Sequence, residues 1–270
     1  MDAQIVEPPR RRRLTPADLW RAMRALGGVI RDPDRTDLIG EFIASTSGSS
    51  SLRLYQELMA DPRARAVLEE GRDLEATLSD RGTLAALPPG SLGRSYLEWT
   101  ARRDFDAAGI ADAIREQVPR DLGGPFPALA ARVVDQHDLW HVLNGWDSDI
   151  HGELHLLGFS YAQLGGRGWW ILGRLAVFFL SSAGRSDSAG YFRHAMARGR
   201  ETPTLAGVDW EAMLPLPLAE VRRRLGIDEP VPYQRLEQAD IDRLRAKSPV
   251  LRFLDHVLPA REPAIERSRP

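Results

Sequence analysis

Cysteine is absent from this chain of 270 residues. Its absence excludes disulfide bonds, catalytic thiolates and cysteine-bound metal, so any metal site has to use histidine and carboxylate side chains. Lysine is nearly absent as well, since Lys247 is the only one and the remaining cationic side chains are arginines. With a net charge of −2, the protein offers no electrostatic basis for bulk binding of nucleic acid.

Two further absences narrow the class of protein. Runs of alternating β-branched residues are almost missing, which argues against a β-sheet larger than a short hairpin. No serine stands in a Gly-x-Ser-x-Gly turn, so a hydrolase triad has no support. Because hydrophobic residues make up 43% of the chain and charged residues 27%, we expect a sizeable core beneath a soluble surface.

The sequence is rich instead in helical periodicity. A capping residue followed by proline, at Thr15-Pro16, predicts a helix that runs to about residue 30. The whole pattern predicts an all-α fold, with a single compact multi-helix domain over residues 15–230 and no internal repeat. Further helices are predicted near residues 35–46, 50–60, 62–79, 93–117, 127–144, 148–164, 168–183, 187–199 and 217–225.

The two ends of the chain differ from the middle. Residues 1–14 are predicted to be a basic, disordered tail, and residues 231–270 an irregular C-terminal extension. The first residues contain no apolar run of a secretory signal, and Asp2 and Glu7 suit a mitochondrial presequence poorly. The predicted class is therefore a bacterial cytoplasmic protein.

Residues 168–180 form the most apolar segment of the chain. The segment is too short to cross a bilayer and carries Arg174 in its middle, so we do not expect it to be transmembrane. A helix that is apolar all round is usually buried in a core, which is the first interpretation. The alternative is that this helix lines a groove for a long apolar ligand or docks on a membrane surface.

The pattern that carries chemistry is His137-Asp138-x-x-His141, followed after eleven residues by Glu153. On a helix, His137 and His141 lie about 40° apart in projection, and Asp138 falls within the same arc of roughly 100°. Glu153 is predicted on the next helix, so a close helix pair would assemble four nitrogen and oxygen ligands, a set that suits zinc, iron or manganese. The competing interpretation is a polar helix face that binds no metal.

The turn between the two helices favours the metal site. Gly145 tolerates the left-handed conformation that ends helices, so Asn144-Gly145 is the predicted stop. Asp147 or Asp149 can cap the next helix by accepting its free N–H groups. A connection this short usually makes the helices antiparallel neighbours, which returns Glu153 to the side of the histidines.

His151 and His155 form a second pair with helical spacing and compete for the same role. On their helix, Glu153 projects roughly 160–200° away from both, so it cannot share a site with them. Leu156 and Leu157 follow Glu153 at helical spacing. We therefore expect Glu153 to face inward and the two histidines to lie on the surface or behind the ligands.

Several other stretches accompany the metal pattern, namely Asp32–Arg35, Leu58–Pro62, Leu87–Tyr96, Gly158–Gln163, Pro217–Arg222 and Leu225–Ile227. Together with His-Asp-x2-His-x11-Glu, they resemble the coenzyme Q (ubiquinone) biosynthesis protein 4 family over about residues 30–228. Ala64 departs from this resemblance, because the family is expected to carry a glycine there. The tail and the extension lie outside the similar region.

This resemblance implies an all-helical fold with a divalent metal held by the four expected catalytic residues His137, Asp138, His141 and Glu153. Zinc is the first choice, with iron or manganese as alternatives. The implied function is metal-dependent replacement of the carboxyl at ring carbon 1 by hydroxyl on a polyprenylated hydroxybenzoate, the work of a decarboxylase (lyase) or oxidative decarboxylase in ubiquinone biosynthesis. The resemblance also implies organisation of the other biosynthetic enzymes and peripheral contact with a membrane, here the bacterial inner membrane, and it is compatible with a homodimer.

Two alternatives to this function stay open. Four protein ligands fill a tetrahedral zinc site, whereas catalytic zinc normally keeps one position open, so a non-catalytic prenyl-lipid-binding scaffold with a structural metal is the main competitor. A phosphohydrolase, suggested by the His-Asp pair, is weaker because His194 and His256 do not match its further ligands. The decarboxylase and the prenyl-lipid-binding scaffold would both need an apolar groove or tunnel for the prenyl tail. The candidates to line it are Trp169, Ile171, Leu172, Phe178 and Phe179.

Overall fold

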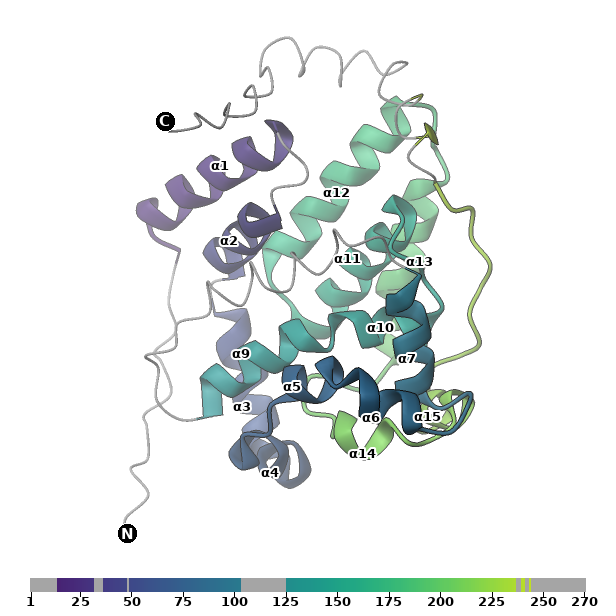
Figure 1. The fold of residues 1–270 in the computed structure, drawn as a ribbon. Helices are drawn as coiled ribbons and strands as arrows, with labels where there is room; N and C mark the ends of the chain where they lie inside the picture. Colours follow the sequence, from purple (N-terminus) through teal and green to yellow (C-terminus); the bar gives the residue numbers. More distant parts are fainter. Residues whose placement is uncertain are drawn as a thin grey trace, which may run out of the picture.

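A computed structural model describes residues 14–31, 36–47, 49–102, 125–236, 239–240 and 243. Within these ranges the regular backbone is helical, apart from an isolated antiparallel bridge between Ser91 and Pro217, which confirms the predicted all-α class (Figure 1). The helices are α1 (Pro16–Arg31), α2 (Thr36–Ser47), α3 (Ser50–Ala60), α4 (Pro62–Glu70), α5 (Leu74–Ser79), α6 (Arg81–Ala86), α7 (Leu92–Ala101), α9 (Pro125–Asp135), α10 (His137–Asn144), α11 (Ile150–Leu164), α12 (Arg167–Ser182), α13 (Ser188–Glu201), α14 (Trp210–Met213) and α15 (Leu218–Arg224).

Side-chain caps determine where many of these helices begin. The N–H of Thr15 donates to Asp18 Oδ2 at 3.0 Å and the N–H of Asp18 donates to Thr15 Oγ1 at 3.2 Å, which confirms the predicted start of α1. Aspartate side chains accept backbone N–H groups at five further starts, those of α4, α5, α6, α11 and α14. The residues are Asp61, Asp73, Asp80, Asp149 and Asp209.

Three predicted segments differ from the observed helices. The helix predicted over 62–79 is divided because Gly71, with a φ of 61°, ends α4 before α5 begins. The helix predicted over 127–144 is divided at Gln136 into α9 and α10. The helix predicted over 93–117 ends at Ala101 as α7, and its remainder lies mostly outside the described residues. The short helices α6 and α14 were not predicted, because they depend on caps rather than on periodicity.

The largest core cluster surrounds α10 and α11. Trp140 and Trp146 both meet the Phe159 ring edge-on, with ring centroids 5.5 and 5.8 Å apart. On the far side of the cluster, the buried Nε1–H of Trp210 donates to Gln136 Oε1 at 2.7 Å. α7, α14 and α15 pack against the same cluster, so α10 and the start of α11 are held from several directions.

A second layer consists of α1, α2 and α12, which lie side by side (Figure 1). Ala25 on α1, Phe42 on α2 and Leu172 on α12 share one small apolar cluster. The apolar segment 168–180 is thus buried along one face, as the first interpretation predicts, but Trp170 remains 43% exposed and Phe178 55% exposed. No helix in the described ranges is both long and apolar enough to cross a membrane.

The predicted terminal segments fall largely outside the described residues. Of the tail over residues 1–14, only Leu14 is described. Of the extension, residues 231–236 are described without a gap from the domain, and these six residues contain no regular secondary structure. These six residues contact the start of α11 through Tyr233 and Leu236, so this part of the extension is packed against the domain.

Candidate metal centre

The predicted turn between α10 and α11 is confirmed in detail. Gly145 has a φ of 70°, its N–H donates to Val142 O, and the N–H of Trp146 donates to His141 O at 3.1 Å. This pair of bonds is the Schellman arrangement that commonly ends helices. Asp149 then caps α11 by accepting the N–H of His151 at 3.0 Å. The turn therefore directs the chain back past α10.

This reversal brings Glu153 between the two histidines of α10. Glu153 Oε1 lies 3.3 Å from His141 Nε2, and Glu153 Oε2 lies 3.9 Å from His137 Nε2. One ligand atom from each of the three residues lies within 4.8 Å of the others, which is a spacing that could hold a metal ion. Two imidazoles and a carboxylate are a donor set of zinc, iron and manganese sites.

Asp138 occupies a different position from the other three predicted ligands. Its Oδ1 lies 3.0 Å from His137 Nδ1, the nitrogen that does not face Glu153. A proton on Nδ1 in this contact leaves the lone pair of the imidazole on Nε2. Carboxylates commonly hold metal-binding histidines in this way, so the geometry favours Asp138 as the residue that orients His137.

His141 provides a test of whether the site fits a cation. Its side chain is completely buried and stacks against Trp99 of α7, with ring centroids 5.1 Å apart. Neither ring nitrogen forms a hydrogen bond in the described part of the chain, and the 3.3 Å approach of Nε2 to Glu153 lacks hydrogen-bond geometry. A buried polar group without a partner costs about 1–3 kcal/mol, and a cation on Nε2 would remove that cost for one nitrogen. The residues therefore fit a divalent metal.

The predicted placement of His151 and His155 on the surface is wrong, because both side chains are buried. His151 Nδ1 lies 2.7 Å from Gln234 O, and its Nε2 lies 3.2 Å from Ser188 Oγ. His155 Nδ1 lies 2.7 Å from His151 O, and burial lowers the pKa of His155 to about 4, so this imidazole is neutral at pH 7. The error arose because α13 and residues 231–236 cover this face of α11. Neither histidine belongs to the ligand cluster.

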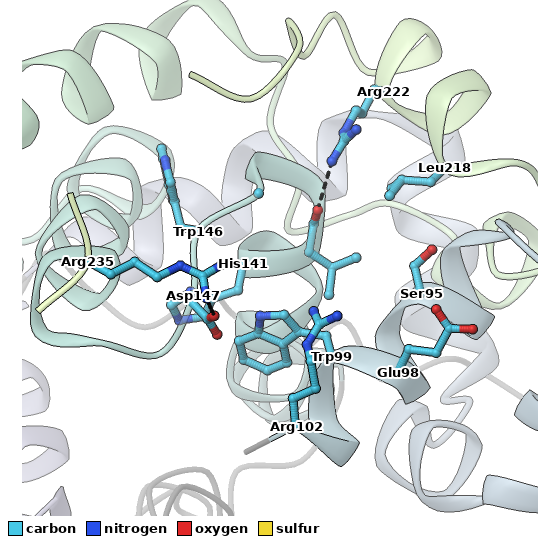
Figure 2. A pocket seen from close by; sticks show the side chains of 12 residues that line it. Ser95, Glu98, Trp99, Arg102, His141, Trp146, Asp147, Leu218, Arg222 and Arg235 are labelled. Atoms are coloured by element: carbon cyan, nitrogen blue, oxygen red, sulfur yellow. Dashed lines mark hydrogen bonds and ion pairs between the residues drawn. The ribbon is translucent and has the colours of Figure 1, made fainter. Parts of the chain in front are cut away.

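A pocket of about 270 Å³ adjoins the site through His141 (Figure 2). Three arginines, two acidic residues and two indole rings contribute to its walls. None of the residues predicted for an apolar groove lines it, and the described residues show no groove of that kind. The lining residues are Ser95, Glu98, Trp99, Arg102, His141, Val142, Gly145, Trp146, Asp147, Leu218, Arg222 and Arg235.

Sequence reasoning missed Trp99 and Arg222, which hold α10 in place. Arg222 donates from Nε to Leu143 O at 2.7 Å and from Nη2 to Val142 O at 3.1 Å, so it satisfies carbonyls at the C-terminal end of α10. Arg222 lies 79 residues from Leu143, and a distant arginine carries no local signal of this role. A tryptophan in a helix, likewise, is ordinarily expected in the core.

Three comparisons relate the chain to known proteins. The family model "Coenzyme Q (ubiquinone) biosynthesis protein Coq4" matches residues 18–231. The mitochondrial ubiquinone biosynthesis protein COQ4 of Yarrowia lipolytica is 29% identical over 229 residues, which cover 82% of this chain and 84% of the relative. The corresponding protein of Botryotinia fuckeliana is 27% identical over 221 residues, covering 80% and 76%.

A solved structure shares the fold. The crystal structure of a protein from Nostoc punctiforme superposes with a TM-score of 0.59 at 21% identity, covering 78% of this chain and 97% of that one. At this level of identity the likeness concerns the arrangement of helices alone.

The predicted location in a bacterial cytoplasm, peripheral to the inner membrane, is wrong by these comparisons. The curated relatives from Yarrowia lipolytica, Scheffersomyces stipitis, Botryotinia fuckeliana and Neurospora crassa are all named as mitochondrial. The prediction rested on the first few residues of the chain, including Asp2 and Glu7. Those residues lie before the segment that the family model matches, so they are not part of the similarity to the family.

Proposed function

Because the chain belongs to the coenzyme Q (ubiquinone) biosynthesis protein Coq4 family, we propose that it acts in ubiquinone biosynthesis, on a polyprenylated hydroxybenzoate precursor. The proposed reaction is replacement of the carboxyl at ring carbon 1 by hydroxyl, with dependence on a divalent metal. Loss of carbon dioxide leaves an electron pair on that carbon, and introducing the hydroxyl requires an oxidant from outside the chain. The observation that carries the proposal is the cluster of His137, His141 and Glu153.

In this proposal His137, His141 and Glu153 hold the metal, zinc being the first choice. A bound divalent cation supplies positive charge that stabilises the negative charge developing on substrate oxygens, an effect on the order of several kcal/mol. His141 is fixed by burial and by its stack on Trp99, while Asp138 orients His137. Such preorganisation keeps the ligand atoms in place as charge develops.

The number of protein ligands bears on the choice between catalysis and a structural role. The cluster contains three residues, and Asp138 is engaged with His137 Nδ1. Catalytic zinc sites usually have three protein ligands and an open position, whereas structural sites have four. The side chains of His137 and Glu153 are also 25% and 31% exposed, which is compatible with access for a substrate oxygen. These features support catalysis over the non-catalytic scaffold.

Peripheral membrane contact is part of the proposal, because a polyprenyl tail partitions into lipid. Its support is a set of exposed apolar side chains on two helices of one layer, namely Leu19, Trp20 and Met23 of α1 and Trp170 and Phe178 of α12. The α1 side chains are 58–60% exposed and those of α12 are 43% and 55% exposed. Exposed apolar patches of this kind mark protein or membrane contacts. Contact with other ubiquinone biosynthesis enzymes is proposed on family membership alone.

The decisive experiment combines metal analysis with an activity assay. We expect near-stoichiometric metal in the wild type and its loss in His137→Ala and Glu153→Gln, with unchanged helical circular dichroism. Glu57→Gln makes the same chemical change as Glu153→Gln at an exposed position of α3, and it should keep the metal. The wild type, but neither ligand variant, should then release carbon dioxide from a prenylated hydroxybenzoate.

Two outcomes would contradict the proposal. Ligand variants that lose metal but retain wild-type product formation would show that the metal has no part in the reaction. Well-folded wild type that takes up no zinc, iron or manganese on reconstitution would exclude a metal-dependent reaction at His137, His141 and Glu153.

A further inference from the structure

Residues 231–236, here called the C-terminal strap, lie across the start of α11. All but Val231 fall beyond the segment that the family model matches. Leu236 anchors the strap, because its side chain is only 4% exposed and packs in a cluster with Leu154 of α11 and Val177 of α12. An irregular segment held by a buried leucine forms part of the folded domain.

The strap supplies donors to the cap of α11. Asp149 Oδ2 accepts the hydroxyl of Tyr233 at 2.5 Å, and Asp149 Oδ1 accepts the N–H of Leu236 at 3.1 Å. Oδ1 also accepts the N–H of His151 in the first turn of the helix. Two of the three donors that surround this capping carboxylate therefore come from the strap, and one comes from the helix.

The hydroxyl of Tyr233 connects the cap with the preceding turn. It accepts the N–H of Asp147 at 2.8 Å while it donates to Asp149. Burial and the hydrogen bond to Asp149 raise the pKa of Tyr233, so the phenol stays protonated and keeps donating. A Cβ on Gly152 would lie 1.8 Å from Asp147 O and 3.0 Å from the Tyr233 hydroxyl, so the first turn of α11 packs directly against this pair.

Polar contacts on both sides hold the strap against the turn. Gln234 O lies 2.7 Å from His151 Nδ1, and Gln234 Oε1 accepts from Arg185 at 2.9 Å. Arg235 pairs with Asp147 Oδ2 at 2.6 Å, at the edge of the pocket beside His141 (Figure 2). The strap is thus attached to the α10–α11 turn, to α11 and to the segment before α13.

The cap is linked to the metal cluster through the backbone. The N–H of Glu153 donates to Asp149 O at 2.9 Å, so the backbone position of Glu153 follows that of Asp149 by one helical hydrogen bond. The Glu153 carboxylate in turn lies 3.3 Å from His141 Nε2. A shift of the cap would therefore move a ligand atom relative to the two histidines, and metal sites tolerate displacements of only about 0.5 Å.

We propose that Tyr233 is a positioning residue for the metal centre, whose hydroxyl holds the Asp149 cap and thereby places Glu153 on the first turn of α11. The inference rests on the proposed function, since it concerns the same three ligands. It assigns to the extension a role in the site that family membership does not supply.

Removing the hydroxyl tests the proposal. Tyr233→Phe should weaken zinc affinity by about 10–100-fold, the usual effect of losing a residue that holds a metal ligand. The absorption spectrum of the cobalt-loaded protein should change as well, because it reports the geometry around the ion. Val67→Ala is the control for general destabilisation, since it removes packing from the buried side of α4, outside the cluster that contains Leu236. It should lower the melting temperature but keep the wild-type affinity and cobalt spectrum.

Amide hydrogen exchange on the metal-free protein gives a second, independent readout. The N–H groups of His151 and Glu153 should exchange faster in Tyr233→Phe and at the wild-type rate in Val67→Ala. Wild-type affinity, spectrum and exchange in Tyr233→Phe would overturn the positioning role. A wild type that binds no metal would instead overturn the proposed function, and exchange at His151 and Glu153 would still decide whether Tyr233 holds the first turn of α11.

Discussion

At the scale of single residues, the candidate metal site depends on His141, whose ring nitrogens are buried away from water. His141 is completely buried with no hydrogen bond to either ring nitrogen among the residues described. Burying these nitrogens without partners costs free energy. A cation bound to one of them would offset that cost, because metal binding to the folded state adds directly to stability. Asp138 and His137 add a carboxylate–imidazole contact at 3.0 Å beside it.

Metal loading should stabilise the protein by an amount set by mass action. With free zinc at a hundredfold excess over Kd, the free energy of unfolding should rise by about 2.7 kcal/mol. Chelation should reverse the effect, and Glu153→Gln should show no zinc-dependent change. Urea denaturation with and without zinc measures it. An equal zinc effect in Glu153→Gln would mean that the metal binds elsewhere.

Asp138 and His141 should differ in what their substitution does to metal binding. Asp138→Asn leaves the three ligands in place and should weaken zinc affinity by about 10–100-fold through the orientation of His137. His141→Ala removes a ligand and should abolish stoichiometric binding. Competition with a chromophoric chelator distinguishes the two cases. Complete loss of binding in Asp138→Asn would show that Asp138 is itself a ligand, as the family resemblance implies.

At the scale of elements, buried ion pairs join helices that are distant in the sequence. Arg132 of α9 is 3% exposed and makes a two-pronged pair with Glu211 of α14, at 2.8 and 2.9 Å. Arg72, just before α5, lies 3.7 Å from the same carboxylate and 2.9 Å from Asp209. The four-residue helix α14 is too short to be stable alone. These ion pairs therefore attach it to the domain together with the buried Trp210.

Glu211→Gln should destabilise the protein by about 3–5 kcal/mol, because it leaves the buried Arg132 guanidinium without its counter-charge. Glu220→Gln removes a carboxylate from a solvent-accessible ion-pair group on α15 and should change stability little. Urea unfolding of the two variants compares them. A loss in Glu211→Gln no larger than that in Glu220→Gln would contradict a structural role for the α9–α14 pair.

The same pair predicts how stability depends on pH. Burial raises the pKa of Glu211, but the hydrogen bonds and charge of Arg132 outweigh it and hold that pKa below the ordinary value of 4.5. As the pH falls, the unfolded chain therefore takes up the proton first. The contribution of the Glu211 carboxylate to stability is complete above about pH 4.5 and is lost as the pH falls through its lower pKa in the folded state. The wild type should lose more stability than Glu211→Gln over this acid range, measured by urea unfolding at each pH. Parallel losses would contradict the assignment.

At the scale of the whole molecule, the layer of α1, α2 and α12 exposes large apolar side chains of α1 and α12. Arg24 lies over the Trp20 ring at 5.6 Å and Arg174 over the Trp170 ring at 6.0 Å, so cationic side chains border the exposed aromatics. The acidic residue of α1, Asp18, is buried, and α12 contains none. Arg24 also pairs with Glu41 of α2 at 2.6 Å. Aromatic side chains bordered by arginines suit the interface of an anionic bilayer.

Replacing both tryptophans should weaken membrane binding without unfolding the protein. The double variant Trp20→Ser, Trp170→Ser should bind vesicles of phosphatidylcholine and phosphatidylglycerol at least about tenfold more weakly, since burying a large apolar side chain contributes about 1.5–3 kcal/mol. Val231→Ser changes an exposed apolar residue that belongs to neither α1 nor α12, and it should bind as the wild type does. Vesicle sedimentation measures all three proteins.

Unchanged vesicle binding in the double variant would contradict membrane docking through α1 and α12. Sedimentation velocity without lipid tests the alternative that these exposed residues contact a second copy of the chain. Conversion of a wild-type dimer into monomers by the double variant would assign the face to a homodimer.

The parts of this protein that could be predicted from the sequence are those with local causes. The cap at Thr15, the stop at Gly145 and the cap at Asp149 each depend on residues within a few positions. The approach of Glu153 to the histidines of α10 follows from the same local geometry, because a five-residue turn leaves two helices few ways to pack. Helix breaks at Gly71 and Gln136 were missed, since periodicity continues across them.

The sequence by itself therefore determined the helical class, the family and three of the four predicted ligands, His137, His141 and Glu153, that converge in the candidate metal cluster. Helix period, caps and ligand spacing act over short distances. Only the tertiary structure decided that His151 is buried, that Arg222 holds the end of α10 and that Tyr233 holds the cap of α11. Those contacts join residues 37, 79 and 84 positions apart. Side chains this distant meet through the packing of whole helices, which no local pattern encodes.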